Sequence, residues 1–206
     1  MSVDSNAADK PLPALRVLLV DEDPARAKIV EESLVEAGCR IAAVARPEDD
    51  LVERVKASAP DVIIVDMDSP SRDTLESLRA ISREVPRPIV MFVDTSDTKM
   101  IEEAISAGVS AYVVDGLSSR RVKPVLDVAI ARFKEFQALR QELEKTKTSL
   151  KERRVIERAK GLLMDEKRMS EEDAYRTLRK LAMDQNKRLV DVAEALITYA
   201  QLLHKR

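Results

Sequence analysis

The sequence is poor in the residues that build most catalytic and metal centres. Its 206 residues include one cysteine, Cys39, and one histidine, His204. A single cysteine excludes an intramolecular disulfide, and its place between Gly38 and an apolar run favours a buried structural thiol. A single histidine excludes a multi-histidine metal site and argues against a Ser-His triad. No nucleophile paired with a base is evident, so the sequence predicts a protein that is not an enzyme.

Long apolar runs are also absent. No segment is apolar for the length that a bilayer requires. Residues 1–14 are polar and acidic and lack the pattern of a signal peptide, so we expect a flexible leader there. The sequence therefore predicts a cytoplasmic protein with no membrane contact.

The charges are unevenly distributed although the net charge is only −2. Residues 131–206 hold 19 Lys and Arg against 13 Asp and Glu, a net of +6, whereas residues 1–130 hold 16 against 24, a net of −8. An acidic first part and a basic tail favour two modules with different partners.

Residues 15–131 alternate between apolar segments of strand length and segments with helical periodicity. The expected strands are "LRVLLV", "CRIAAVA", "DVIIVD", "RPIVMFV" and "SAYVV". Five such alternations predict an α/β fold with a doubly wound five-stranded parallel sheet. In the first helix we expect Ala27, Val30, Leu34 and Val35 to face the sheet, and in the last one Val125, Val128 and Ala129.

Acidic residues follow two of these strands. Asp21 and Glu22 end the first, and Asp66 and Asp68 end the third. In a flavodoxin-like strand order these ends are neighbours, so the carboxylates would repel one another unless Mg²⁺ binds or their pKa values rise. The alternative is that such residues only cap helices, as Asp23 before Pro24 would.

The segments "VLLVDEDP", "DVIIVDMDSP" and "RPIVMF" resemble a response-regulator receiver domain over residues 15–131. The resemblance implies that Asp21, Glu22 and Asp66 form a Mg²⁺ site and that Asp66 is the phosphoacceptor. It also implies a hydroxyl after the fourth strand and a lysine after the fifth, which hold the phosphoryl group.

Two of these implied supports are missing from the sequence. Val93 stands where the family has Thr or Ser, and Asp115 stands where it has lysine. Valine cannot hydrogen-bond a phosphoryl oxygen, and reversing the lysine charge costs roughly 1–4 kcal/mol at a few ångströms. We therefore expect a pseudo-receiver that needs no cofactor and is switched by protein contact. The alternative is that weakened phosphorylation of Asp66 survives.

Residues 132–150 lack helix breakers and predict a helical linker. Phe136, Leu143 and Leu150 recur every seven residues, with Leu139 between them. This spacing favours a short coiled coil through which two chains could pair as a homodimer. The alternative is a single solvated helix with many charge pairs.

Residues 151–206 predict three amphipathic helices that form a small three-helix bundle. Ser170 is the expected N-cap of the middle helix. Its apolar positions, which we expect to face inward, are Ala174, Leu178, Leu181 and Ala182. The polar positions carry many Lys and Arg residues, which taken alone would indicate only a solvated face.

The segments "VIERAKGLLM", "SEEDAYRTLRKLAMDQN" and "LVDVAEALI" resemble the ANTAR domain of AmiR/NasT-type transcription antiterminators, and "YVVDGL" resembles the nitrate-assimilation (NasT) branch. The resemblance implies binding to a leader RNA with two paired stem-loops, which prevents a terminator hairpin. It also implies control by a NasS-like ligand-sensing protein that responds to nitrate or nitrite.

The candidate RNA contacts are the basic and aromatic residues within these segments: Arg154, Arg158, Lys160, Tyr175, Arg176, Arg179 and Lys180. Cations would bind phosphates, and the aromatic ring could stack on a base. Two rival functions remain at this point. One is a DNA-binding helix-turn-helix regulator, although the tail has no short Gly-containing turn between two short helices. The other is a protein-interaction adaptor with a solvated basic face.

Overall fold

Five short apolar segments form one parallel sheet. A computed structural model describes residues 14–114 and 119–203. The strands are β1 (Arg16–Asp21), β2 (Arg40–Ala45), β3 (Val62–Met67), β4 (Ile89–Val93) and β5 (Ala111–Val114), in the spatial order β2-β1-β3-β4-β5. Every pairing is parallel, so the predicted doubly wound sheet is confirmed.

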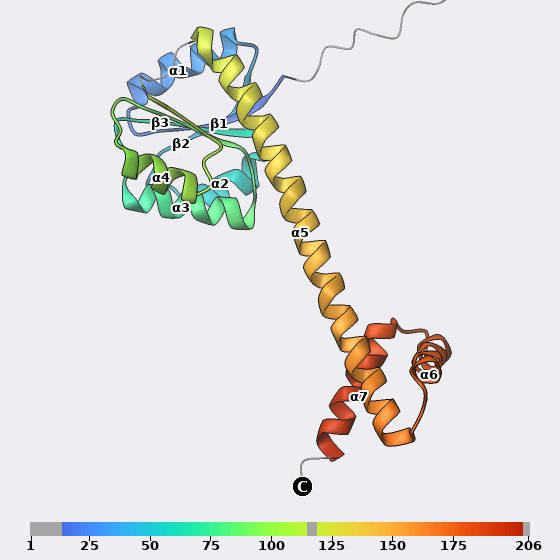
Figure 1. Cartoon of the computed structure of the whole chain (residues 1–206). Coiled ribbons are helices and arrows are strands. Elements are labelled where there is room, and N and C mark those ends of the chain that lie inside the picture. The colour runs from blue at the N-terminus through green and yellow to red at the C-terminus, as the bar shows by residue number, and fades with distance from the viewer. Residues whose placement is uncertain (1–13, 115–118, 204–206) are drawn as a thin grey trace, which may run out of the picture. The chain divides into compact units, whose positions relative to one another are not determined.

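Helices cover both faces of the sheet (Figure 1). They are α1 (Pro24–Glu36), α2 (Leu51–Ser58), α3 (Arg72–Glu84), α4 (Thr98–Ser106) and the start of α5 (Ser119–Lys167). Successive residues of β1 point to opposite faces. Val17 and Leu19 therefore pack in the layer with α1 and α5, whereas Leu18 and Val20 pack in the layer with α2, α3 and α4.

Polar side chains determine where the first four helices begin. Each of the N-cap side chains accepts a hydrogen bond from a backbone N–H in the first turn, which has no partner within the helix. The N-caps of α1 to α4 are Asp23, Asp50, Ser71 and Asp97. Because these helices begin where the preceding strands end, the caps bring α1 and α3 to the acidic edge of the sheet.

Helix α5 is a single helix of 49 residues. Its first turns bury Val122, Leu126 and Ala129 against the sheet. The next residues, 132–150, are almost entirely exposed, as the predicted helical linker requires. The last turns bury Ala159 and Leu163 in a separate core.

That separate core is a three-helix unit. The end of α5 packs with α6 (Glu171–Asp184) and α7 (Leu189–Leu203) around small and branched side chains. Ser170 caps α6 as predicted, since its Oγ accepts a hydrogen bond from the Asp173 N–H at 3.1 Å. The contacts divide the chain into two compact units, Met1–Phe136 and Gln137–Arg206.

Three residues expected to face a core are exposed instead: Val35, Val128 and Leu181. Val35 follows the buried Leu34 and lies one helical step, 100°, around α1 from it. Val128 lies between the buried Leu126 and Ala129 on the solvent side of α5, and Leu181 lies beside the buried Ala182 at the edge of its stripe. The buried stripe of each helix is narrower than its apolar pattern, because only one neighbouring layer covers it.

No helix within the described ranges combines the length and the hydropathy that a membrane crossing needs.

Candidate functional site

The acidic ends of β1 and β3 lie side by side. In the parallel register Asp21 pairs with Asp66, so both carboxylates lie at the same edge of the sheet. Both residues are buried, with 3% and 5% of their surface exposed. Glu22 and Asp68 follow them and are more exposed. The predicted clustering of these four carboxylates is therefore present.

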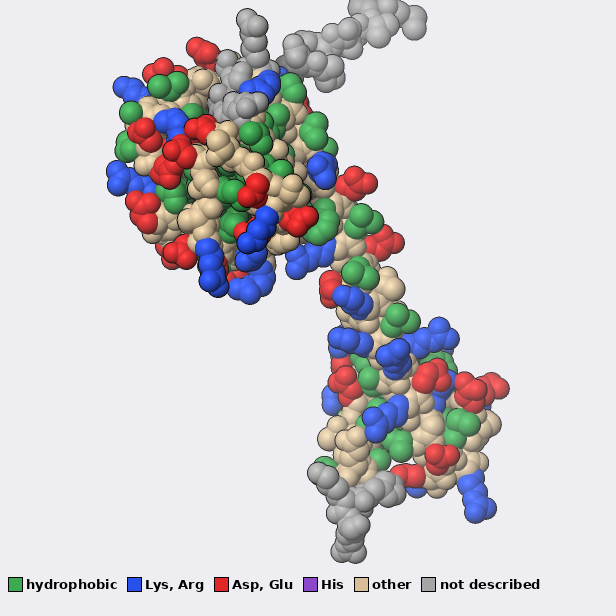
Figure 2. Space-filling view, turned by 60° about the vertical axis from the view of Figure 1, so that its left-hand side comes forward, with side chains coloured by type: hydrophobic (Ala, Val, Ile, Leu, Met, Phe, Trp, Pro, Cys, Tyr) green, Lys and Arg blue, Asp and Glu red, His purple; other side chains and the backbone are tan. Residues whose placement is uncertain are grey.

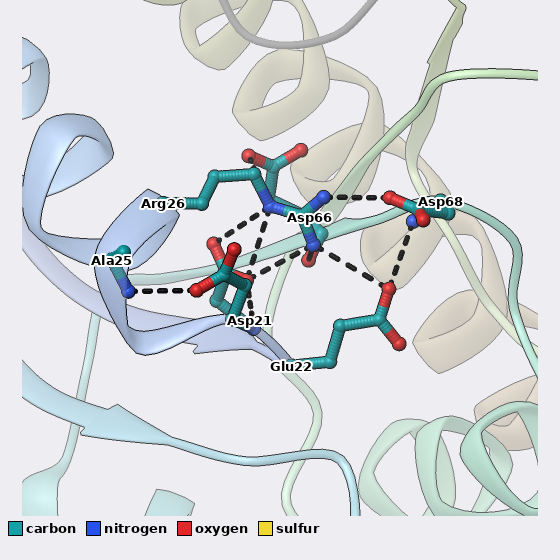
Figure 3. Close-up of polar contacts among 7 residues, drawn as sticks. Asp21, Glu22, Ala25, Arg26, Asp66 and Asp68 are labelled. Atoms are coloured by element: carbon teal, nitrogen blue, oxygen red, sulfur yellow. Dashed lines mark hydrogen bonds and ion pairs between the residues drawn. The ribbon is translucent and has the colours of Figure 1, made fainter.

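The guanidinium of Arg26, from the first turn of α1, lies among these carboxylates (Figure 3). Its Nη2 is 3.0 Å from Asp21 Oδ1, and its Nη1 is 2.7 Å from Asp68 Oδ1. Burial opposes the charge of Arg26, but hydrogen bonds to Asp21 and Asp68 raise its pKa above the ordinary value. Arg26 thus partly neutralises a cluster that would otherwise be strongly repulsive.

The Asp66 carboxyl at this edge has a shifted pKa. Burial raises its pKa from the ordinary 3.8 to about 6, although nearby Arg26 acts in the opposite direction. Asp21, Asp94 and Asp68 raise the pKa further through charge repulsion. Asp66 therefore carries a proton more readily than a surface carboxyl does.

The acidic edge does not fit a Mg²⁺ ion in this arrangement. Mg²⁺ requires six oxygen ligands at about 2.1 Å in octahedral geometry. The oxygens of Asp21 that such an ion would use already accept hydrogen bonds from Arg26, and Asp21 Oδ1 also accepts one from the Asp23 N–H at 2.8 Å. Across residues 14–114 and 119–203, no group of three or more His, Cys, Asp or Glu side chains is placed to hold a metal.

The expected switch positions can be located only in part. Val93 is the last residue of β4 and is fully buried, and its aliphatic side chain offers no hydroxyl at this position. Asp115 lies outside the described residues. Ser96, three residues after Val93, does carry a hydroxyl, but its Oγ is within hydrogen-bonding distance of the Tyr112 hydroxyl, at 2.8 Å.

Four of the seven candidate RNA contacts are exposed cations that no acidic partner neutralises. Among the described residues, these side chains make no hydrogen bond or ion pair: Arg154, Arg158, Arg179 and Lys180. The first two lie one turn apart on α5, and the other two are on α6. Figure 2 shows Lys and Arg side chains interspersed with Asp and Glu on the three-helix unit. Unpaired cations on a folded bundle are suited to bind phosphate groups.

The other three candidates differ from that group. Arg176 is exposed but forms ion pairs with Glu172 at 2.8 Å and Asp173 at 3.4 Å. Tyr175 is exposed and lines a surface hollow with Lys160. The Lys160 side chain is only 9% exposed, and its Nζ lies 2.7 Å from Glu171 and 2.9 Å from Glu157.

The structure therefore gives Lys160 a different environment from the one expected. Hydrogen bonds to Glu171 and Glu157 raise the pKa of Lys160. Its ammonium group is therefore paired within the bundle. Through these ion pairs Lys160 joins the end of α5 to the start of α6, which gives it a positioning role within the bundle.

Sequence reasoning missed Arg26 as a member of the acidic site. It stands three residues after the capping Asp23, in the turn whose side chains point back toward the end of β1. A basic residue at that spacing, next to an acidic strand end, was the available signal. Asp94, which follows β4, was also not assigned, although its charge acts on Asp66.

Comparisons with known proteins match both units. Residues 17–126 match the response regulator receiver domain, and residues 144–197 match the ANTAR domain. The transcriptional regulatory protein PdtaR of Mycobacterium tuberculosis is 32% identical over 197 residues, which is 96% of either chain. The nitrate regulatory protein of Klebsiella oxytoca is 35% identical over 130 residues, which is 62% of this chain and 32% of that protein.

Solved structures resemble the sheet unit. The receiver domain of a modulated diguanylate cyclase from Desulfovibrio desulfuricans G20 has a TM-score of 0.51 at 20% identity and covers 59% of this chain and 97% of that one. A LuxR-family two-component response regulator from Aurantimonas sp. SI85-9A1 has a TM-score of 0.51 at 21% identity, with coverage of 57% and 86%. These likenesses support the fold alone. Together, the two matched domains and the full-length similarity show that the chain belongs to the response regulators that join a receiver domain to an ANTAR domain.

Proposed function

We propose that the chain is a transcription antiterminator that binds a leader RNA with two stem-loops through its ANTAR domain. The observation that carries this proposal is the set of exposed cations within the ANTAR match that have no acidic partner in the part of the chain that the structure describes. Sequence-specific RNA recognition mostly targets loop bases that are not stacked in a duplex, and cations hold the flanking phosphates. Arg154 and Arg158 on α5, with Arg179 and Lys180 on α6, supply such cations.

Exposed Tyr175 adds an aromatic surface to this set. It lines a hollow with Glu171, Glu172 and Lys160. Base stacking on an aromatic ring contributes about 1–3 kcal/mol per base. In our proposal the ring stacks on a loop base, while the cations of α5 and α6 bind the phosphates on either side of it.

Pairing of two chains would place two ANTAR domains on one RNA. Phe136, Leu139, Leu143 and Leu150 are large apolar side chains that are exposed at the spacing of a coiled-coil seam. We propose that this seam dimerises the chain. A dimer that holds one loop binds the second intramolecularly, which raises avidity without any new contact.

The receiver in this proposal responds to a protein, not to a phosphoryl group. Val93 provides no hydroxyl at the end of β4, and the Ser96 hydroxyl lies against Tyr112. A NasS-like ligand-sensing protein of the nitrate assimilation type is the proposed controlling partner. The similarity to a protein named as a nitrate regulator supports this choice.

Acetyl phosphate with Mg²⁺ tests this form of control. The intact mass of the chain should remain unchanged after incubation, and its oligomeric state should be the same. Stoichiometric addition of a phosphoryl group together with a change of oligomeric state would contradict control by protein contact.

A titration against RNA tests the main proposal. The full chain is titrated with a two-stem-loop leader RNA, with a variant RNA whose loops are closed by base pairs, and with duplex DNA of equal length, at two salt concentrations. We expect the chain to bind RNA only when the loops are open. The logarithm of the binding constant should fall with the logarithm of the salt concentration, with a slope of about −0.7 per neutralised phosphate. Preference for duplex DNA would favour a DNA-binding regulator, and absence of nucleic-acid binding would favour a protein adaptor.

A further inference from the structure

One cation already occupies the middle of the receiver's acidic edge. The guanidinium of Arg26 lies within 4 Å of oxygen atoms from all four carboxylates. The closest distances are 2.7 Å to Asp68, 3.0 Å to Asp21, 3.5 Å to Glu22 and 3.9 Å to Asp66. Its Nη2 is also 3.3 Å from the backbone oxygen of Asp66 (Figure 3).

The position of Arg26 is set by the backbone around it. Asp23 caps α1 with a hydrogen bond from the Ala25 N–H at 2.8 Å, which fixes the first turn of the helix. From that turn the Arg26 side chain reaches over β1 and β3, and only 27% of it is exposed. A planar guanidinium can hold two carboxylates at once, and here Nε and Nη2 contact Asp21 while Nη1 contacts Asp68.

A dissolved divalent cation would have to use the same oxygen atoms. Asp21 Oδ1 accepts from Arg26 and from the Asp23 N–H, and Glu22 Oε1 accepts from the Asp68 N–H at 3.2 Å. Mg²⁺ would need these oxygens at about 2.1 Å, and its charge would repel the guanidinium at close range. Arg26 is tethered to the site, so it competes as an intramolecular group with a high effective concentration.

We propose that Arg26 is a built-in counter-ion that takes the place of the divalent cation at this receiver's acidic edge. The guanidinium stabilises the four carboxylates in one arrangement and joins the start of α1 to the end of β3. The receiver then keeps this arrangement whether or not Mg²⁺ is present. The inference concerns the receiver alone and is independent of RNA binding by the ANTAR domain.

The test compares the full chain with its R26M variant and with K28Q as the matched control. Met approximates the aliphatic stem of arginine but removes the charged guanidinium. Lys28 is exposed on the same helix and has no partner among the described residues, so K28Q changes the net charge equally without touching the site. Binding of Mg²⁺ is measured by calorimetry, and binding of Mn²⁺ by electron paramagnetic resonance.

We expect the unaltered chain and K28Q to show no saturable binding at low millimolar metal. R26M should bind both ions at least about tenfold more tightly, and its melting temperature should rise with Mg²⁺ by the linkage of binding to folding. In metal-free buffer R26M should melt below the unaltered chain, because four carboxylates then lack a counter-ion.

Two outcomes would overturn the proposal. One is equal metal affinity of the unaltered chain and R26M. The other is saturable Mn²⁺ binding by the unaltered chain in the micromolar range, which is measured on the natural sequence and so holds even where R26M does not fold.

Discussion

Asp66 has to ionise in a site from which most water is excluded. Its side chain is 7% exposed, and burial raises its pKa from 3.8 to about 6. Between pH 3.8 and about pH 6 the folded chain binds more protons than the unfolded chain, so the free energy of unfolding falls as the pH rises. The favourable contribution is fully present below pH 3.8 and is lost as the pH rises through about 6.

Substitution D66N should remove this loss. The pKa difference corresponds to roughly 3 kcal/mol as an upper limit. We expect D66N to be more stable than the unaltered chain by about 1–3 kcal/mol at pH 7.5 and by much less near pH 4. Urea denaturation in metal-free buffer at both pH values measures the difference.

The control for D66N is D127N. Asp127 is exposed on α5, so its neutralisation should give no pH-dependent gain in the free energy of unfolding. A gain for D66N that is equal at both pH values would show that ionisation of Asp66 is not its source.

Gly108 provides a second prediction for a single residue. Its φ is +96°, and an added Cβ would lie 2.0 Å from Ser82 Oγ, which donates a hydrogen bond to the Ala107 carbonyl. G108A should therefore destabilise the chain by about 3 kcal/mol or more, as strain and overpacking combine. Gly38 has a φ of +84° with open space around it, so G38A should cost only about 1–2 kcal/mol. Thermal denaturation of both variants measures this, and equal losses would contradict the steric argument.

At the residue scale, the sequence predicts which residues are neighbours in the sheet better than it predicts which groups a long side chain contacts. Asp21 and Asp66 could be placed together because parallel register follows from strand order. The place of the Arg26 side chain at this edge could not be predicted, because the direction of a flexible side chain depends on which charges the fold brings near it. Lys160 shows the same limit, since its partner Glu171 belongs to the next helix.

At the scale of elements, α5 and α6 carry cations of two kinds. Arg158 is exposed and has no ion pair within residues 14–114 and 119–203, whereas Lys160 is paired with both Glu157 and Glu171. We expect R158A to leave the melting temperature unchanged, to weaken RNA binding several-fold, and to make the log–log salt slope shallower by about 0.7. Titration of the two-stem-loop RNA at several salt concentrations measures both effects.

The comparison for R158A is K160M. It should lower the melting temperature of the C-terminal unit, because Glu157 and Glu171 then lose their shared cation. E171Q should lower it in the same direction. A K160M variant that keeps its melting temperature but loses RNA binding would assign Lys160 to the RNA and contradict its positioning role.

Helix positions followed from the sequence more closely than buried faces did. Cap residues such as Asp23 and Ser170 fix a helix start through local hydrogen bonds, so the sequence carries that information. Burial at the edge of an apolar stripe depends on the neighbouring layer, and Val35 and Leu181 lie beyond what that layer covers.

For the whole molecule, our proposal is that the exposed apolar side chains of α5 pair two chains and so determine how many ANTAR domains act together. Leu143 is 52% exposed and lies seven residues from both Phe136 and Leu150. In the expected coiled coil it faces its own counterpart in the second chain. A glutamate there would place two like charges in contact within an apolar seam, which opposes pairing.

We therefore expect L143E to be a monomer at concentrations where the unaltered chain is a dimer. Its affinity for one stem-loop should be unchanged, while its affinity for the two-loop RNA should fall by roughly a hundredfold, because the second contact is no longer intramolecular. Sedimentation and RNA titration measure the two effects separately. Q141E adds the same charge two residues away on the outer side of α5 and should change neither. A dimeric L143E would show that chains pair elsewhere, and a monomer that keeps full affinity for the two-loop RNA would show that one ANTAR domain suffices.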